Sequence, residues 1–109
     1  MDDIMNNLIQ ELRRGTLIIN VLSQLEAPKY GYSLIELLEH KGVPIEANTL
    51  YPLLRRLEKQ SLLQSDWNTE GTKPRKYYQM SGYGRQIYQQ LCAAFLEMTE
   101  TTSGLIKGE

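Results

Sequence analysis

The sequence predicts a mainly α-helical protein with a small β-hairpin. Apolar residues recur every three or four positions in four segments, which is the period of amphipathic helices. Between the third and the fourth of these segments, two short runs suited to strands flank a turn that contains Gly71 and Pro74. With 109 residues, the chain is one domain, or one domain with an appended helix.

Two helical segments open the chain. The first is expected from Asp3 to about Leu25, and Gly15 interrupts its middle, where a bend or a close contact is expected. The second is expected from Tyr32 to Lys41, with Ser33 as its N-cap and Gly42 ending it in the usual C-terminal manner. The residues VPI that follow are too few for more than a stub of strand.

The third helical segment lies in the stretch NTLYPLLRRLEKQSLL and is expected from about Ala47 to Gln60. Its buried face consists of Leu50, Leu53, Leu54 and Leu57. Arg55, Arg56 and Lys59 point away from that face. Pro52 cannot donate a backbone hydrogen bond, so the helix either starts there or starts earlier with a local irregularity. The residues just before Pro52 fit the helical face, which favours the earlier start.

The hairpin is followed by a long helix. Strands are expected in LLQSDWN and RKYYQM, where Tyr77 and Tyr78 should point to opposite faces. Ser81 then caps a helix from about Gly82 to Ile106, and this helix is longer than so small a core can cover. We therefore expect a subunit interface along its apolar seam, which consists of Ile87, Leu91, Ala94 and Met98.

Composition argues against several chemistries. The single cysteine, Cys92, allows no internal disulfide, and with His40 as the one histidine an ordinary Cys/His zinc site cannot be assembled. No phosphate-cradling glycine motif or G-x-S-x-G motif is present, so we expect no cofactor, no metal and no enzymatic activity. No apolar run reaches the roughly 20 residues that cross a membrane, and the acidic start MDDIMNN does not resemble a signal peptide. A cytoplasmic location is therefore expected.

The charge distribution is more informative than the net charge of −1. Residues 48–85 hold seven basic and three acidic residues, whereas the remainder holds five basic and ten acidic ones. An acidic scaffold thus presents one basic segment, and such a segment can bind phosphate groups even on a nearly neutral molecule.

Three helices followed by a hairpin match the winged helix-turn-helix fold. In that fold the third helix enters the DNA major groove, and the hairpin, or wing, reaches the neighbouring backbone or minor groove. The sequence therefore predicts DNA contacts from the basic residues of the third helix and the wing, with Arg and Lys supplying phosphate attraction. These residues are Arg55, Arg56, Lys59, Lys73, Arg75 and Lys76.

The stretches RRGTLIINVLSQLEAPKYGYSLIELL, NTLYPLLRRLEKQSLL and GTKPRKYYQMSGYG resemble the PadR family of bacterial transcriptional regulators. The resemblance covers about residues 12–96, and its most specific parts are YGY, TLYPLLRRLE and RKYY in this order. It implies a dimeric winged helix that represses transcription. It also implies that Thr49 and Tyr51 lie near the DNA. Ser61 departs from the family pattern, because glycine is common at that position before the hairpin.

The resemblance also implies how subunits pair, because the first and last helices of each subunit pack with those of the partner in this family. Residues 1–81 would form the DNA-binding domain, and residues 82–109 a dimerisation helix. The expected interface consists of Leu8, Leu12, Ile87, Leu91, Ala94, Phe95 and Met98. Some members sense small aromatic molecules in a pocket lined by an aromatic residue of the last helix. Phe95, with Leu91 beside it, falls at that position, where drug-sensing members have Trp.

The sequence thus predicts a homodimeric regulator that represses transcription from a pseudo-palindromic operator, with half-sites one or two helical turns apart. A small aromatic effector would act between the subunits. The alternative is a winged-helix module whose basic face binds an acidic protein partner. Weak DNA binding with little dependence on salt would favour the alternative.

Overall fold

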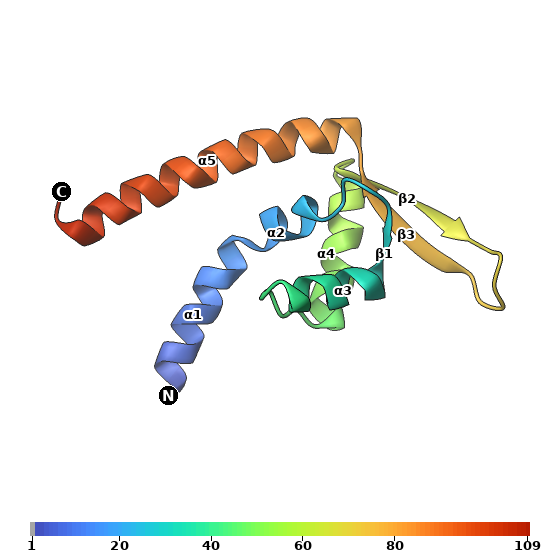
Figure 1. Cartoon of the computed structure of the whole chain (residues 1–109), viewed down its shortest axis with the longest axis horizontal. Coiled ribbons are helices and arrows are strands. Elements are labelled where there is room, and N and C mark those ends of the chain that lie inside the picture. Colours follow the sequence, from blue (N-terminus) through green and yellow to red (C-terminus); the bar gives the residue numbers. More distant parts are fainter. Residues whose placement is uncertain (1) are drawn as a thin grey trace.

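The computed structural model describes residues 2–109 and confirms the mainly helical class with a small antiparallel sheet (Figure 1). The elements in chain order are α1 (Asp3–Gly15), α2 (Leu17–Ser23), β1 (Lys29–Tyr30), α3 (Gly31–His40), α4 (Ala47–Lys59), β2 (Leu63–Asn68), β3 (Arg75–Met80) and α5 (Gly82–Lys107). Helices α1 and α5 extend away from the centre, so the chain measures 57 × 35 × 22 Å along its principal axes (Figure 1).

The first helical segment is divided into two helices. The break falls at Thr16, directly after Gly15, where the backbone angles are φ −105° and ψ 2°. The amide group of Thr16 donates to the carbonyl oxygen of Arg13 at 3.1 Å, which tightens the last turn of α1. The expected bend is therefore confirmed. Because of it, α1 extends away from the core, whereas α2 contributes the buried residues Val21 and Leu22.

Helix α3 begins earlier than expected, and the prediction of Ser33 as its N-cap is wrong. The N-cap is Tyr30, and Gly31 is the first residue of the helix. Gly31 is buried because the ring of Tyr51 occupies the space that a side chain at this position would need. Only glycine allows this close approach of α3 and α4.

The sheet has one strand more than the expected hairpin. Its order is β1-β3-β2, and all neighbours are antiparallel. In β1, Lys29 pairs with Tyr78 and Tyr30 pairs with Tyr77. Two residues carry no readable period, which is why the sequence pattern did not reveal β1. The VPI segment forms no strand.

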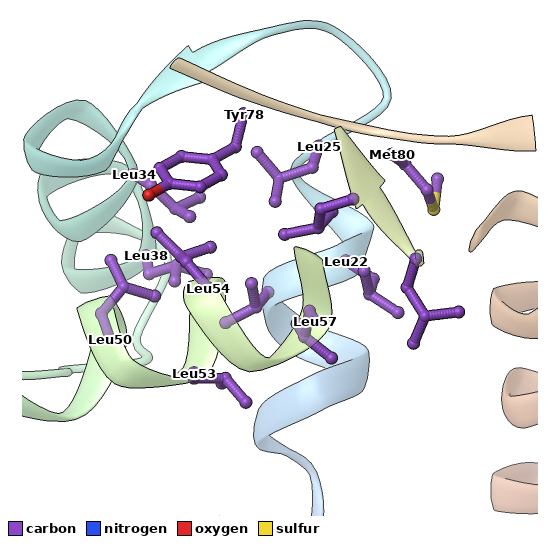
Figure 2. Close-up of a cluster of buried hydrophobic side chains, with 13 residues drawn as sticks. Leu22, Leu25, Leu34, Leu38, Leu50, Leu53, Leu54, Leu57, Tyr78 and Met80 are labelled. Atoms are coloured by element: carbon purple, nitrogen blue, oxygen red, sulfur yellow. The ribbon is translucent and has the colours of Figure 1, made fainter. Parts of the chain in front are cut away.

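The core lies where α2, α3, α4 and the sheet meet (Figure 2). Helix α4 contributes all four leucines of its predicted face, Leu50, Leu53, Leu54 and Leu57. Tyr78 is 4% exposed and points toward Leu34 and Leu54, whereas Tyr77 lies on the opposite face of the sheet. Each fully buried leucine stabilises the fold by about 1.5–3 kcal/mol. The leucine face therefore fixes which side of α4 points outward.

Helix α4 begins at Ala47, so the earlier of the two expected starts is confirmed. Pro52 is exposed and lies inside the helix. Since proline has no amide hydrogen, the carbonyl group of Asn48, four residues earlier, loses its usual helical partner. This irregularity lies on the outward side of α4, where water can satisfy the free carbonyl group.

Helices α3 and α4 end in the same way but with different residues. After α3, the amide group of Gly42 donates to Glu39 and that of Val43 donates to Leu38. After α4, the amide group of Ser61 donates to Glu58 and that of Leu62 donates to Leu57. This pair of bonds is the Schellman motif, which requires a residue with positive φ. Gly42 has φ 91° and Ser61 has φ 67°.

Helix α5 starts where Ser81 was expected to cap it, because the Ser81 hydroxyl accepts a hydrogen bond from the amide group of Gly84 at 2.9 Å. Within residues 2–109, no helix is long and apolar enough to span a bilayer.

Candidate nucleic-acid interface

The outward side of α4 carries the cations that the sequence pattern placed there. Arg55, Arg56 and Lys59 are exposed, and no carboxylate of residues 2–109 forms an ion pair with any of them. The leucines between them are buried, so the three cations cannot rotate into the core. Thr49 is also exposed, in the first turn of the helix. The result is a free basic surface along one side of a well-packed helix.

Tyr51 is less accessible than its neighbours on α4. It is half-buried, and its ring packs against the core and over Gly31. The ring therefore locks the first turns of α3 and α4 together. Any contact of Tyr51 with a ligand would come from the outer edge of the ring.

Glu58 connects α4 to both long strands of the wing. Its carboxylate accepts a hydrogen bond from the Ser65 hydroxyl of β2, and its Oε1 is 3.2 Å from the Nζ of Lys76 in β3. The hydrogen bond from Ser65 is the main cause that lowers the pKa of Glu58, with Lys76 adding to it against the effect of burial. Glu58 is therefore ionised across the neutral pH range.

Lys76 is held between this carboxylate and two aromatic rings. Its Nζ lies 5.9 Å from the ring centroid of Trp67 and 5.2 Å from that of Tyr78. Burial lowers the pKa of Lys76, but the hydrogen bond to Glu58 and the neighbouring charges raise it more, so the pKa lies above its ordinary value. Lys76 is thus a charged residue whose charge is already neutralised within the chain.

Arg75, the neighbour of Lys76, points to the opposite face of β3. Its guanidinium carbon lies 4.9 Å from the ring centroid of Tyr30, and its Nη1 donates to the hydroxyl oxygen of Tyr32 at 3.1 Å. The rings of Tyr30 and Tyr32 stack with centroids 6.0 Å apart, and the Asn68 amide donates to the Tyr30 hydroxyl at 2.7 Å. Arg75 is therefore held in position without a carboxylate partner.

The tip of the wing holds the remaining predicted cation. Lys73 is exposed in the connection between β2 and β3. Asn68 stabilises the start of this connection, because its Oδ1 accepts a hydrogen bond from the amide group of Glu70 at 3.0 Å. Lys73 thus belongs to the turn at the end of the hairpin, which projects away from the helices (Figure 1).

The charge count of the basic segment changes once ion pairs are known. Within residues 2–109 the structure contains two side-chain ion pairs, Lys76 with Glu58 and Arg85 with Glu26, the latter at 2.6 Å. Both pairs use cations of the basic segment. The cations that remain without an ion pair are Arg55, Arg56, Lys59, Lys73 and Arg75, all on α4 or the wing.

The predicted interface residues form two uncovered apolar surfaces. No residue of α1 is buried, and Leu8 and Leu12 are 52% and 75% exposed. On α5, Ile87 packs against the core of its own chain, Leu91 and Ala94 are half-buried, and Phe95 and Met98 are exposed. Six further exposed apolar residues of these two helices lie outside the predicted interface, which are Ile4, Met5, Tyr83, Leu96, Leu105 and Ile106.

Two hollows occur near the predicted sites. One of about 590 Å³ lies between the end of α1, the start of α2 and the loop before α4, and Thr49 forms part of its wall. The other, of about 350 Å³, lies along α5 and is lined by Ala94, Glu97, Met98, Thr101 and Thr102. Neither Phe95 nor Leu91, the predicted pocket residues, lines this hollow.

Two groups of functional interest were missed at the level of sequence. Tyr30 and Tyr32 contact Arg75 from 45 and 43 residues away, and no local pattern signals these contacts. Glu58 is one of the three acidic residues of the basic segment, and the sequence pattern does not show that its carboxylate is directed at the wing. Both contacts depend on which face of β3 each side chain occupies.

Helices α3 and α4 followed by a wing define a winged helix-turn-helix, a class in which the second helix of the pair contacts DNA. Residues 18–90 match the transcriptional regulator PadR-like family. The chain belongs to this family and is a transcriptional regulator rather than an enzyme.

Solved structures support the assignment. A PadR family transcriptional regulator from Eggerthella lenta DSM 2243 has a TM-score of 0.95 at 47% identity, covering 99% of this chain and 96% of that one. A PadR-like transcription factor from Bacteroides fragilis has a TM-score of 0.74 at 33% identity, covering 91% and 98%. A transcriptional regulator from Clostridium thermocellum has a TM-score of 0.79 at 30% identity, covering 85% and 95%. The comparison with curated proteins found no similar sequence.

Proposed function

We propose that this protein is a homodimeric repressor that binds a pseudo-palindromic operator through α4 and the wing. The observation that carries the proposal is the outward side of α4, where Arg55, Arg56 and Lys59 are exposed without ion pairs while the opposite side is buried. A helix of this kind fits the major groove, and its cations can contact phosphates or read guanine edges. Thr49 and the outer edge of Tyr51 extend the contact toward the start of the helix.

The wing supplies a second contact. Lys73 in the turn and Arg75, the first residue of β3 after it, reach the neighbouring phosphates or minor groove. Lys76 is the third wing contact predicted from sequence. Its charge is neutralised by the ion pair with Glu58. Because DNA is the partner, the protein acts in the cytoplasm, where the bacterial chromosome lies.

Dimerisation is proposed from the uncovered apolar surfaces of α1 and α5. A helix of 13 residues that buries none of its side chains is marginal in water, so α1 needs another surface to cover it. Leu8 and Leu12 of one subunit and Leu91, Ala94, Phe95 and Met98 of the other provide such surfaces. In this division, residues 1–81 bind DNA and residues 82–109 pair the subunits, with Ile87 bridging the two parts by packing on the core.

A small aromatic effector is part of the proposal. Phe95 and Leu91 do not line the hollow on α5 but lie within three residues of Ala94, which does, and a second subunit placed on α5 would enclose that hollow. An effector bound there would change the distance between the two α4 helices. It can do so only if it binds one dimer arrangement more tightly than the other.

The test is a fluorescence-anisotropy titration against DNA from upstream of the protein's own gene, beside a scrambled duplex, at several salt concentrations. We expect tighter binding to the upstream DNA and a steep fall in affinity with salt, because phosphate contacts release counterions. Arg55→Ala should weaken binding and relax base preference, whereas Lys107→Ala, at the far end of α5, should change neither. Equal weak binding to both duplexes, repeated with fragments selected from the whole genome, would contradict the proposal.

The second candidate is a winged helix that binds an acidic protein through the same cations. The acidic remainder of the chain leaves the basic surface as the one complementary region for such a partner. The candidate predicts weak DNA binding with little salt dependence, so the titration above separates the two.

A further inference from the structure

Adjacent cations of β3 are in opposite electrostatic states. Arg75 and Lys76 differ by one position, so they point to opposite faces of the strand. Arg75 is exposed and its guanidinium group contacts Tyr30 and Tyr32, whereas the ammonium group of Lys76 lies 3.2 Å from the carboxylate of Glu58. The charge of Arg75 is available to a ligand, and the charge of Lys76 is already neutralised by Glu58.

The Glu58 carboxylate is the point where three elements meet. It belongs to α4, accepts from Ser65 of β2, and pairs with Lys76 of β3. The side chains of Lys76 and Glu58 are 29% and 32% exposed, so the pair is shielded but not sealed from water. These contacts join the DNA-facing helix to both long strands of the wing on its α4 side.

We propose that Glu58 is a specificity-determining residue of the DNA interface, which withholds the Lys76 ammonium group from the phosphates and fixes the wing against α4. Arg75 is then the cation of β3 that contacts DNA, and Lys76 is a positioning residue. This inference rests on the proposed function, since it assigns roles within the same interface.

Neutralising a cation can raise specificity because specific and non-specific affinity depend differently on charge. Every free cation near the phosphates strengthens binding to all sequences alike, and this strengthens the competing sites as much as the operator. A carboxylate that neutralises one cation removes part of this common attraction. The same carboxylate keeps the wing at a fixed distance from α4, which matters for a surface that must contact two parts of the duplex together.

The contacts of Arg75 fit its opposite role. Stacking over Tyr30 and the hydrogen bond to Tyr32 limit the conformations of its side chain but leave its full charge. A guanidinium group held in this way loses less conformational entropy when it binds a phosphate. Substitutions of Arg75 and Lys76 can therefore serve as controls for each other in a binding experiment.

The experiment measures binding to an operator fragment obtained by selection and to a scrambled duplex, as a function of salt concentration. The proteins are the full-length wild type and the variants Arg75→Met, Lys76→Met, Glu58→Gln and the double variant Glu58→Gln/Lys76→Met. Thermal melting of each protein checks that it folds. If Glu58→Gln does not fold, Glu58→Ala, which also removes the carboxylate and suits a helix, replaces it.

The slope of log affinity against log salt is the deciding quantity, because a purely structural role does not change it. We expect Arg75→Met to reduce the magnitude of the slope by about 0.9, the value of one phosphate contact, and Lys76→Met to leave it unchanged. Glu58→Gln should bind the scrambled duplex several-fold more tightly with a steeper slope, and the double variant should return to the wild-type slope.

Two results would overturn the inference while the proposed function stands. One is a loss of slope in Lys76→Met equal to that in Arg75→Met, with the wild type binding its operator. The other is a Glu58→Gln variant, or Glu58→Ala in its place, that binds the scrambled duplex no better than the wild type does. A wild type that binds neither duplex with salt dependence would instead refute the proposed function, and this inference with it.

Discussion

Ser61→Gly should stabilise the protein, because Ser61 occupies a backbone conformation that suits glycine. Its φ of 67° lies in the left-handed region, where a side chain costs about 1–2 kcal/mol. Glycine removes that cost but adds about 0.4–1 kcal/mol of conformational entropy to the unfolded chain. The Ser61 carbonyl oxygen accepts the Ser81 hydroxyl at 2.7 Å, and glycine keeps this bond. The net gain is roughly 0.5–1 kcal/mol.

Thermal unfolding followed by circular dichroism measures this gain as a rise in Tm of about 2–6 °C. All proteins must be compared at one concentration, since association of subunits would itself shift Tm. Ser61→Ala is the matched control, because it removes the hydroxyl group without relieving the backbone, and it should show no such rise. Gly42→Ser is the reciprocal change, since Gly42 ends α3 at φ 91°, and it should lower Tm.

The reasoning is refuted if Ser61→Gly melts at or below the wild-type temperature while Gly42→Ser has no effect. The two Schellman motifs would then tolerate either residue, and the positive φ would carry no measurable cost in this chain.

Three further predictions test other contacts. Gly31→Ala should destabilise the protein by about 1–3 kcal/mol in chemical unfolding, because the added methyl group must displace the ring of Tyr51; a wild-type midpoint would contradict the close packing. The lowered pKa of Glu58 means that its ionised form stabilises the fold above its ordinary pKa, and that this contribution is lost as pH falls through the lower folded-state value. The Tm difference between wild type and Glu58→Gln should therefore shrink from pH 7 toward pH 3, and a constant difference would argue against an ionised Glu58. Leu8→Glu should give a sedimentation mass near the 12.6 kDa of one chain, with Gln10→Glu on the same helix as the control that stays dimeric. A dimeric Leu8→Glu would place the interface elsewhere.

The elements that repeat a period were predictable from sequence. The leucine spacing located α4 and fixed which side of it carries Arg55, Arg56 and Lys59, because burial of four leucines outweighs the disruption at Pro52. Turn chemistry located the end of α3 at Gly42. Ser61 ends α4 in the same way, and its positive φ is the reason why glycine suits this position.

The contacts between elements were not predictable. Strand β1 is too short to show alternation, and the start of α3 depends on a packing contact with Tyr51 rather than on a polar cap. A count of charges cannot tell which cations are paired, since Lys76 finds Glu58 18 residues away. The two cations RK in RKYY look alike in sequence, and only the registry of the sheet separates them.

The exposure of most of α1 has a consequence for how much active protein a cell holds. A helix with no fully buried side chain gains much of its order from a second surface, so in the proposed dimer its folding is tied to association. At low copy number the N-terminal segment would fray and be open to proteases, and above the dissociation constant it would be protected. Turnover of the regulator would therefore slow as its own concentration rises, which makes the switch from few copies to many sharper than synthesis alone would give.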